Sequence, residues 1–345
     1  MSEPGPVNVA VVGLGYWGPN LVRVLHELPE ANVVAACDMS VERLARVGRR
    51  YPALDLTTSY DELLADERVE AVAVATPVST HHPLVLAALE AGKHVFVEKP
   101  LAASSAEAEQ LRDVATDLGL TLMPGHTFLY SPPVNLVKRL VDEGELGDIY
   151  FISTSRVNLG LHQSDASVVW DLGPHDFSIL RYWLGTNPVE VSGTARACIV
   201  PSTPDVAFVD LTYANGTVAH VELSWLAPSK LRRTAVVGSQ KMVVYDDTAS
   251  EPVRIFDSGV NLPDPKSFGE YGLTYRTGDI VSPRVDVDEP LALELADLCR
   301  AIRTGSEPRS SASVGVDVVR TIEGVDASLG RGGAPVRLSH AEAMR

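Results

Sequence analysis

The sequence has few cysteines, few aromatic residues and a deficit of positive charge. Its 345 residues include three widely spaced cysteines without a CxxC pair (Cys37, Cys198 and Cys299), which argues against a disulfide framework or zinc site and fits a reducing cytosol. Only 29 basic residues stand against 45 acidic ones, and the formal charge of −16 disfavours general nucleic-acid binding because it repels phosphate backbones. A small anionic ligand is still compatible with this charge, since a local pocket can differ in sign from the whole.

Long apolar runs are also missing. No run approaches the roughly 18 residues that a membrane-spanning helix needs. The N-terminal residues 1–6 lack the basic start and apolar stretch of a signal peptide. Apolar residues still make up 45%, enough for the cores of about two domains. We therefore expect a cytoplasmic protein that binds neither membranes nor nucleic acid.

The first part of the chain alternates short β-branched runs with helical patterns. Residues 7–12, 32–37, 70–75, 94–97 and 121–123 read as strands, and residues 17–27, 41–50, 82–91 and 104–118 read as helices. This alternation predicts βαβ units with a parallel sheet. We expect a domain over residues 1–124.

The pattern changes after residue 124, and residues 125–345 are expected to form an α+β domain. Helices are expected at 131–143, 174–184, 290–304 and 314–329, and one large open, mostly antiparallel sheet is expected from strands at 149–157, 189–199, 207–213, 218–225, 233–237 and 242–246. Asn215-Gly216 is a strong hairpin signal between two of these strands. Residues 247–289 are rich in proline, aspartate and glycine and read as an irregular arm.

A GxGxxG motif follows the first strand and opens the first helix. Gly13 permits the tight turn, Gly15 lets the backbone approach a pyrophosphate, and Gly18 lets the helix pack close to the strand. The loop residues Tyr16 and Trp17 are included in the expected cofactor site. Phosphates can bind here without a basic patch, because the helix N-terminus offers free N–H groups.

Asp38 ends the second strand, 20 residues after Gly18. A carboxylate at this place accepts hydrogen bonds from the ribose hydroxyls and repels a 2′-phosphate, which favours NAD over NADP. NADP stays open because Arg43 is close in sequence. Asp38 could instead only cap the following helix.

Two further segments follow strands at the carboxyl edge of the sheet, where a nicotinamide would lie. One is Thr76-Pro77-Val78-Ser79-Thr80-His81 and the other is Glu98-Lys99-Pro100. The proline after Lys99 restricts the backbone there, and X-Pro bonds tolerate the cis form. A solvent-exposed surface lysine is the alternative for Lys99.

The segment Trp170-Asp171-Leu172-Gly173-Pro174-His175-Asp176 carries a second candidate pair. Pro174 suits the first position of a helix, which would place His175 in its first turn. Asp171 and His175 are four residues apart and can converge on one site. The alternative is a core histidine and a capping aspartate. No set of His, Cys and carboxylate residues has convincing metal spacing.

Together, the glycine motif, Thr76-Pro77…His81, Glu98-Lys99-Pro100 and Asp171-x-x-x-His175 resemble the glucose-fructose oxidoreductase, inositol dehydrogenase and MocA (Gfo/Idh/MocA) family of NAD(P)-dependent sugar oxidoreductases. The resemblance spans essentially the whole chain. It implies an N-terminal Rossmann dinucleotide-binding domain and a C-terminal sheet domain that forms a homodimer or homotetramer. Val78 stands where the family usually has asparagine.

The resemblance implies that Lys99, His175 and Asp171 are catalytic and also contact the substrate. His175 would act as general base, Lys99 would stabilise the developing alkoxide, and Asp171 would orient His175 or bind a neighbouring hydroxyl. Thr76, Pro77, His81, Glu98 and Lys99 would contact the cofactor.

Two stretches, residues 125–132 and 156–160, resemble a branch of nucleotide-sugar 3-dehydrogenases and 3-ketoreductases, and they supply Tyr130, Arg156 and Asn158 as candidate substrate contacts. The expected substrate is therefore a sugar or nucleotide sugar, oxidised or reduced at a secondary carbon. The alternatives are an inositol or free-sugar dehydrogenase of the same fold, and a non-catalytic NAD-dependent sensor or co-regulator.

Overall fold

The computed structural model describes residues 5–160, 166–261 and 274–339. The chain divides into two compact units, Met1–Tyr130 with Asp288–Arg320, and Ser131–Val287 with Thr321–Arg345. The domain boundary predicted after residue 124 stays a prediction. The compact units are not continuous in sequence, because residues 288–320 belong to the first unit.

The first unit contains a parallel sheet of six strands among the described residues, in the order β3-β2-β1-β4-β5-β6. The strands are β1 (Val7–Val12), β2 (Ala31–Cys37), β3 (Asp55–Thr57), β4 (Ala71–Val74), β5 (His94–Glu98) and β6 (Leu122–Gly125). The central strands β1 and β4 are apolar and buried on both faces except at Asn8, as a helix-covered parallel sheet requires. This sheet confirms the predicted Rossmann architecture.

Helices connect these strands, and several begin at serine caps. The hydroxyls of Ser40, Ser59 and Ser104 accept hydrogen bonds from backbone N–H groups three residues later, which satisfies one exposed donor in each helix. The helical elements of this part of the chain are α1 (Gly18–Glu27), α2 (Val41–Arg50), α3 (Tyr60–Ala65), η1 (Val78–Thr80), α4 (His81–Glu90), α5 (Ser105–Asp117) and η2 (Thr127–Tyr130), and α8 (Pro290–Thr304) joins the same unit later.

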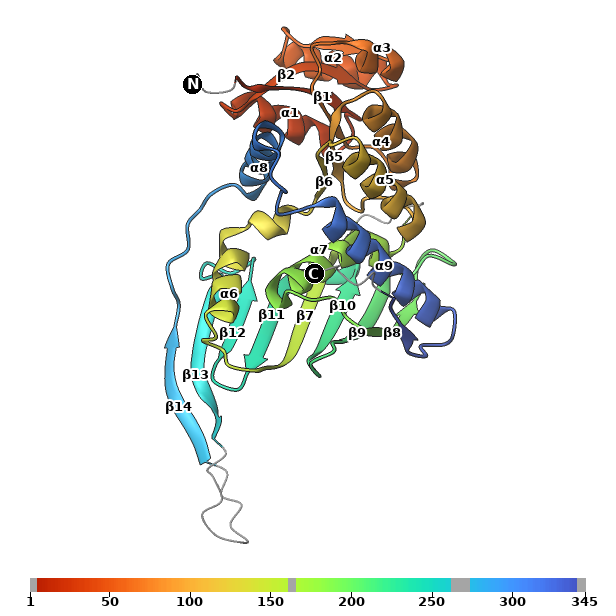
Figure 1. The fold of residues 1–345 in the computed structure, drawn as a ribbon. Helices are drawn as coiled ribbons and strands as arrows, with labels where there is room; N and C mark the ends of the chain where they lie inside the picture. Colours follow the sequence, from red (N-terminus) through yellow and green to blue (C-terminus); the bar gives the residue numbers. More distant parts are fainter. Residues whose placement is uncertain (1–4, 161–165, 262–273, 340–345) are drawn as a thin grey trace. The chain divides into compact units, whose positions relative to one another are not determined.

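The second unit contains a sheet of nine strands among the described residues, in the order β14-β13-β12-β11-β7-β10-β9-β8-β15 (Figure 1). The strands are β7 (Ile149–Leu159), β8 (Glu190–Arg196), β9 (Val206–Thr212), β10 (Val218–Ser224), β11 (Leu226–Gly238), β12 (Met242–Asp246), β13 (Val253–Asn261), β14 (Thr274–Val281) and β15 (Val336–Arg337). Pairing is antiparallel except between β7 and β10, which run parallel. The predicted, mostly antiparallel sheet is thus confirmed.

The Asn215-Gly216 hairpin joins β9 to β10, as predicted, and Gly216 adopts the positive φ of 87° that such a turn requires. Helices α6 (Pro132–Asp142) and α7 (Val168–Leu184) cover one face of this sheet (Figure 1). Helix α9 (Ala312–Leu329) begins in the first unit and ends in the second.

Two sequence-based expectations were wrong. The arm over residues 247–289 contains β13 and β14, which pair antiparallel with each other. Its prolines and glycines interrupt the alternation but leave two strands that extend the sheet. Helix α7 begins at Val168, so Pro174 lies inside it and His175 lies in its third turn. Tertiary packing of this helix outweighs the preference of proline for a first turn.

Among the described residues, no helix is both long enough and apolar enough to cross a membrane.

Candidate functional site

The glycine loop after β1 leaves no room for side chains at two of its three glycines. Gly13 has a φ of +88°, and a Cβ there would lie 2.6 Å from the Ala75 carbonyl oxygen. A Cβ on Gly18 would lie 1.9 Å from the Gly13 carbonyl oxygen, so the start of α1 packs directly on the turn. A Cβ on Gly15 would meet nothing within 4 Å. The loop is therefore closely packed at Gly13 and Gly18 and open at Gly15, as backbone contact with a pyrophosphate requires.

Asp38 closes this loop from the end of β2. Its Oδ2 accepts a 2.6 Å hydrogen bond from the Leu14 N–H, and its Oδ1 accepts a 2.7 Å bond from the Ser40 N–H. The Arg43 guanidinium lies 3.5 Å from the same carboxylate. Asp38 is thus fixed beside the glycine loop, where the sequence places the ribose contact. This arrangement fits bound NAD: the open Gly15 backbone would face the pyrophosphate and Asp38 the ribose.

Tyr16 and Trp17 lie at the exposed side of the loop. Their side chains are 80% and 44% exposed, and their rings meet edge to face with centroids 5.5 Å apart. Both rings are accessible to a ligand, and their cofactor role stays a prediction.

His81 links the two other predicted cofactor segments. Its buried ring lies 2.8 Å from the Pro100 carbonyl oxygen through Nδ1 and 2.9 Å from the Thr76 carbonyl oxygen through Nε2. Burial lowers the pKa of His81, and Lys99 lowers it further, while the two carbonyls oppose the shift. Pro77 follows Thr76 and caps η1, so the ring holds the loop after β4 to the turn after β5.

Lys99 follows β5 at the carboxyl edge of the parallel sheet, and the Lys99–Pro100 bond is cis. The carboxylate of the preceding Glu98 is buried and accepts a hydrogen bond from the Lys99 N–H. Burial raises the pKa of Glu98 to about 7, although the Lys99 charge and this hydrogen bond oppose the shift. Glu98 is therefore a buried acid that is hydrogen-bonded to the backbone of Lys99.

Glu294 on α8 is a buried acid that sequence reasoning missed. It is fully buried, and its Oε2 accepts a 2.7 Å hydrogen bond from the Thr127 hydroxyl. Burial raises its pKa well above the usual value, and the Glu98 and Asp297 charges add to this, while Thr127 opposes it. Its spacing from Leu291, Leu295 and Leu298 places it on the apolar face of α8. This spacing was the sequence feature that could have predicted a buried acid.

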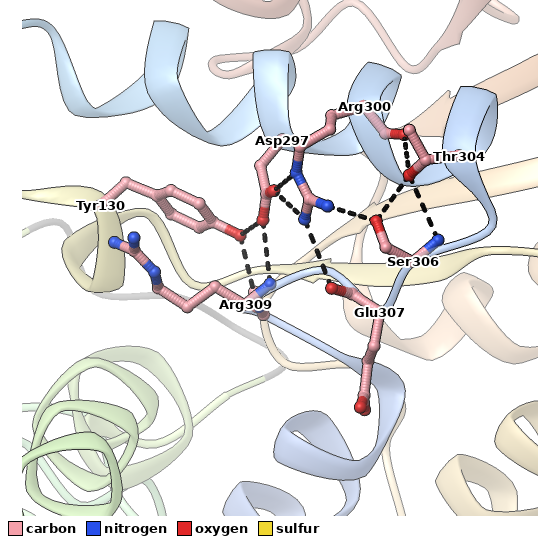
Figure 2. Close-up of polar contacts among 8 residues, drawn as sticks. Tyr130, Asp297, Arg300, Thr304, Ser306, Glu307 and Arg309 are labelled. Carbon is pink, nitrogen blue, oxygen red and sulfur yellow. Dashed lines mark hydrogen bonds and ion pairs between the residues drawn. The ribbon is translucent and has the colours of Figure 1, made fainter.

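The Tyr130 hydroxyl forms hydrogen bonds within the first unit, as Figure 2 shows. It donates a 2.7 Å hydrogen bond to Asp297 Oδ2 and accepts one from the Ser310 N–H at 3.1 Å. The Arg309 guanidinium lies over the tyrosine ring, 5.0 Å from its centroid. Although burial raises the pKa of Asp297, the N–H, hydroxyl and guanidinium donors around it outweigh burial and lower that pKa. A substrate contact by Tyr130 stays a prediction, and this network is its observed environment.

In the second unit, α7 carries Asp171 and His175 one helical turn apart. Asp171 Oδ2 accepts a 3.0 Å hydrogen bond from the indole N–H of Trp225. The His175 carbonyl oxygen accepts a 2.9 Å bond from the Ser178 hydroxyl. The helix therefore brings the two predicted residues together, while Lys99 belongs to the other unit.

Arg156 lies on β7 and is buried against α7. Its Nε lies 2.5 Å from Asp176 Oδ2, and Asp176 Oδ1 accepts a 2.8 Å bond from Thr154. Both side chains of the ion pair are at most 4% exposed. Asn158 follows two residues after Arg156 and so shares its face of the strand. The observed partner of Arg156 is thus an internal carboxylate, and the substrate roles of Arg156 and Asn158 stay predictions.

No group of three or more His, Cys, Asp or Glu residues in the described part of the chain could hold a metal ion.

Two family comparisons cover most of this chain. Residues 7–126 match the oxidoreductase family with an NAD-binding Rossmann fold, and residues 134–244 match the GFO/IDH/MocA C-terminal domain. The chain belongs to the Gfo/Idh/MocA family of oxidoreductases, and its first domain is an NAD-binding Rossmann domain.

Individual relatives differ in their reactions. The chain is 30% identical over 290 residues to D-xylose 1-dehydrogenase (NADP(+)) 2 of Haloferax volcanii, covering 80% of this chain and 83% of the relative. It is 29% identical over 353 residues to scyllo-inositol 2-dehydrogenase (NAD(+)) of Bacillus subtilis, covering 96% of each. The crystal structure of GenD2 from gentamicin A biosynthesis in complex with NAD has a TM-score of 0.82 at 24% identity, over 99% of this chain and 98% of GenD2, which supports the fold.

The glycine loop predicts two separable effects of added methyl groups. Gly15→Ala should leave the melting temperature unchanged, because its Cβ meets nothing, but should weaken NAD binding about tenfold or more by blocking the pyrophosphate. Gly18→Ala should lower the melting temperature by several degrees, because its Cβ collides with the Gly13 carbonyl. Calorimetric titration with NAD and thermal unfolding measure the two effects. Unchanged NAD affinity in Gly15→Ala would contradict the loop's assigned role.

Glu98 predicts a pH-dependent stability. Because its pKa rises from 4.5 to about 7 on folding, the unfolded chain releases this proton at lower pH, and the group's contribution to stability falls as pH rises from 4.5 through 7. Glu98→Gln removes that loss. Relative to the wild type, the variant should gain about 3 kcal/mol of unfolding free energy between pH 4.5 and pH 8.

Urea unfolding at pH 5, 6, 7 and 8 measures this difference. Glu90→Gln, on an exposed position of α4, is the matched control and should show no such trend. A Glu98→Gln difference that stays constant across this range would mean that Glu98 is ionised in the folded protein.

Proposed function

We propose that this protein oxidises a secondary hydroxyl of a nucleotide-linked sugar, or reduces the matching ketone, with NAD as hydride carrier. Within the family, the substrate class rests on the stretches around Tyr130 and Arg156, which resemble nucleotide-sugar 3-dehydrogenases and 3-ketoreductases. The C3 position is inferred from the same resemblance.

The observation that carries this proposal is the place of Lys99 in the NAD-binding unit. Lys99 follows β5 at the same sheet edge as the glycine loop after β1, and only β4 separates these strands. Ligands of such folds bind outside the carboxyl ends of the strands. Because His81 and Glu98 hold the backbone on both sides of Lys99, the ammonium group is presented from a fixed turn.

When bound, NAD supplies the hydride acceptor, and the protein has to manage the hydroxyl proton. Imidazole side chains exchange protons near neutral pH, and His175 is assigned as the general base toward the hydroxyl. The role proposed for Lys99 is to donate a hydrogen bond to a reacting sugar oxygen and stabilise its developing negative charge. Asp171, one turn from His175, orients the imidazole or binds a neighbouring hydroxyl.

The relatives also favour a second substrate class. A free sugar is the substrate named for the Haloferax relative and an inositol for the Bacillus relative. A nucleotide sugar differs from both in its diphosphate, which needs cationic or N–H donors. Comparing UDP-sugars with the corresponding free sugars and inositols separates the two classes, and failure of all of them would favour the non-catalytic sensor.

We further propose that a second copy of this chain covers the open face of the nine-stranded sheet, giving a homodimer or homotetramer. On β7, β9 and β10, alternate residues point away from the helices, and among them Phe151, Phe208 and Val218 are 43%, 41% and 48% exposed. Phe208 stacks on His220, with ring centroids 6.2 Å apart. Exposed aromatic and aliphatic residues on one face favour protein association.

Replacing Lys99 tests the enzymatic proposal. Lys99→Ala should lower kcat by roughly 10²-fold or more, because the developing alkoxide loses its cationic donor. NAD affinity should change little, since Asp38 and the glycine loop carry most of that binding. Steady-state kinetics with NAD and NADP, on the best substrate of the panel, measure both effects.

Lys241→Ala is the control, because Lys241 pairs with Glu145 at the surface of the other unit. It should turn over at the wild-type rate. Near-normal turnover by Lys99→Ala would remove Lys99 from the mechanism, and a clear preference for NADP would overturn the role of Asp38.

The open sheet face makes a separate prediction. Phe208→Lys should convert the oligomer to a smaller species, because a charge would be buried in the interface. Light scattering after size-exclusion chromatography gives the mass. Leu118→Lys, at a 52% exposed position of the NAD-binding unit, should leave the mass unchanged. A wild-type monomer would contradict this interface.

A further inference from the structure

Trp225 is held rigidly between β10 and β11. It is 1% exposed, its N–H donates a 2.9 Å hydrogen bond to the Asp205 carbonyl, and its carbonyl accepts a 2.9 Å bond from the Gly160 N–H. Both polar groups of its backbone are thus engaged, and the side chain leaves the sheet in a fixed direction.

The indole points from the sheet to the first turn of α7. Its Nε1–H donates to Asp171 Oδ2 at 3.0 Å. Gly160 makes room for the ring, since a Cβ there would lie 2.5 Å from Trp225 Cδ1. The contact therefore depends on a glycine that follows β7 and on a tryptophan between β10 and β11, which lie 65 residues apart in sequence.

A hydrogen bond to one carboxylate oxygen fixes the plane of the group and the direction of the other oxygen. Residues that hold a reacting group in this way are worth about 10- to 100-fold in activity at other sites. The bond from Trp225 therefore restrains the direction of the second Asp171 oxygen.

The same turn of α7 has a second, similar anchor. The indole N–H of Trp170 donates a 2.7 Å hydrogen bond to Asp326 Oδ2 on α9. This bond also attaches α7 to the rest of the unit, but its carboxylate belongs to a residue outside the predicted catalytic set. The two tryptophans thus provide a matched pair, one acting on Asp171 and one only on the helix.

We propose that Trp225 is a positioning residue that orients the Asp171 carboxylate for the sugar reaction. This inference rests on the proposed function, because Asp171 has a chemical role only if the protein turns over a sugar. Trp225 itself touches neither the substrate nor NAD in this proposal.

The contact itself is tested without activity. In ¹⁵N-labelled protein, the Trp225 indole N–H resonance is assigned from its loss in Trp225→Phe. It should shift in Asp171→Asn, while the Trp170 resonance stays in place. No shift of the Trp225 resonance would overturn the proposal.

Kinetics test the positioning role. Trp225→Phe keeps an apolar ring but lacks the N–H, and it should lower kcat about 10-fold or more, with KM changed less. Trp170→Phe should leave kcat within about twofold of the wild type. In the Asp171→Asn background, Trp225→Phe should cause no further loss, because the two residues act through one contact. Additive losses would mean a merely structural role for Trp225 and would overturn the proposal.

Two outcomes separate the proposals. Normal turnover by the wild type together with an unchanged kcat in Trp225→Phe would overturn positioning alone. No turnover of any sugar by the wild type would overturn the proposed function, and positioning with it. If Trp225→Phe does not fold, Gly160→Ala replaces it: the added methyl displaces the indole and should cause the same loss of kcat, and an unchanged kcat would overturn the proposal.

Discussion

The hydrogen bond from the Leu14 N–H to the Asp38 carboxylate connects the glycine loop to the neighbouring strand. It extends the parallel ladder between β1 and β2, since the Gly13 N–H already donates to the Cys37 carbonyl at 2.9 Å. The loop is therefore held before any ligand arrives, and the N-terminus of α1 has a defined direction. An acidic protein can in this way bind an anionic dinucleotide through backbone groups, because little conformational entropy remains to be lost.

The turn after β5 is also shaped by a small number of charged groups. Glu98 and Glu294 are two carboxyl groups buried in the NAD-binding unit. Burial raises the pKa of both; the Glu98 charge raises the pKa of Glu294 further, whereas the Lys99 charge favours the charged form of Glu98. Burial disfavours the charged form of a carboxyl group, and a nearby like charge disfavours it further, so both effects raise the pKa of Glu294. Helix α8 thus contributes a buried acid to the unit that carries Glu98 and Lys99, although it is distant from them in sequence.

Much of the fold could be predicted from the sequence, because it depends on local signals. The buried β-branched strands, the GxGxxG loop and the Asn215-Gly216 turn each follow from a short pattern. The strands β13 and β14 could not be predicted, since their alternation is interrupted by residues typical of loops and their pairing depends on the rest of the sheet.

The candidate site divides in the same way. Asp38 and Lys99 were predicted because each directly follows a strand at the carboxyl edge of the sheet. Three buried partners were missed, because each meets its contact from a distant element of its own unit: Asp176 meets Arg156, Trp225 meets Asp171 and Glu294 meets Thr127. Spacing along the chain reports which residues share a face, but long-range hydrogen bonds depend on the completed fold.

Helix α7 illustrates how such contacts replace what the backbone lacks. Pro174 lies inside the helix and has no N–H to donate to the carbonyl of Trp170, so the first turns have one backbone hydrogen bond fewer. The side chains of Trp170 and Asp171 leave this same stretch and bond to α9 and to the sheet. A proline between Asp171 and His175 is therefore tolerated because the turn is held from outside. The Asp171 carboxylate is thereby bonded to a tryptophan between two strands of the sheet as well as being carried by the helix.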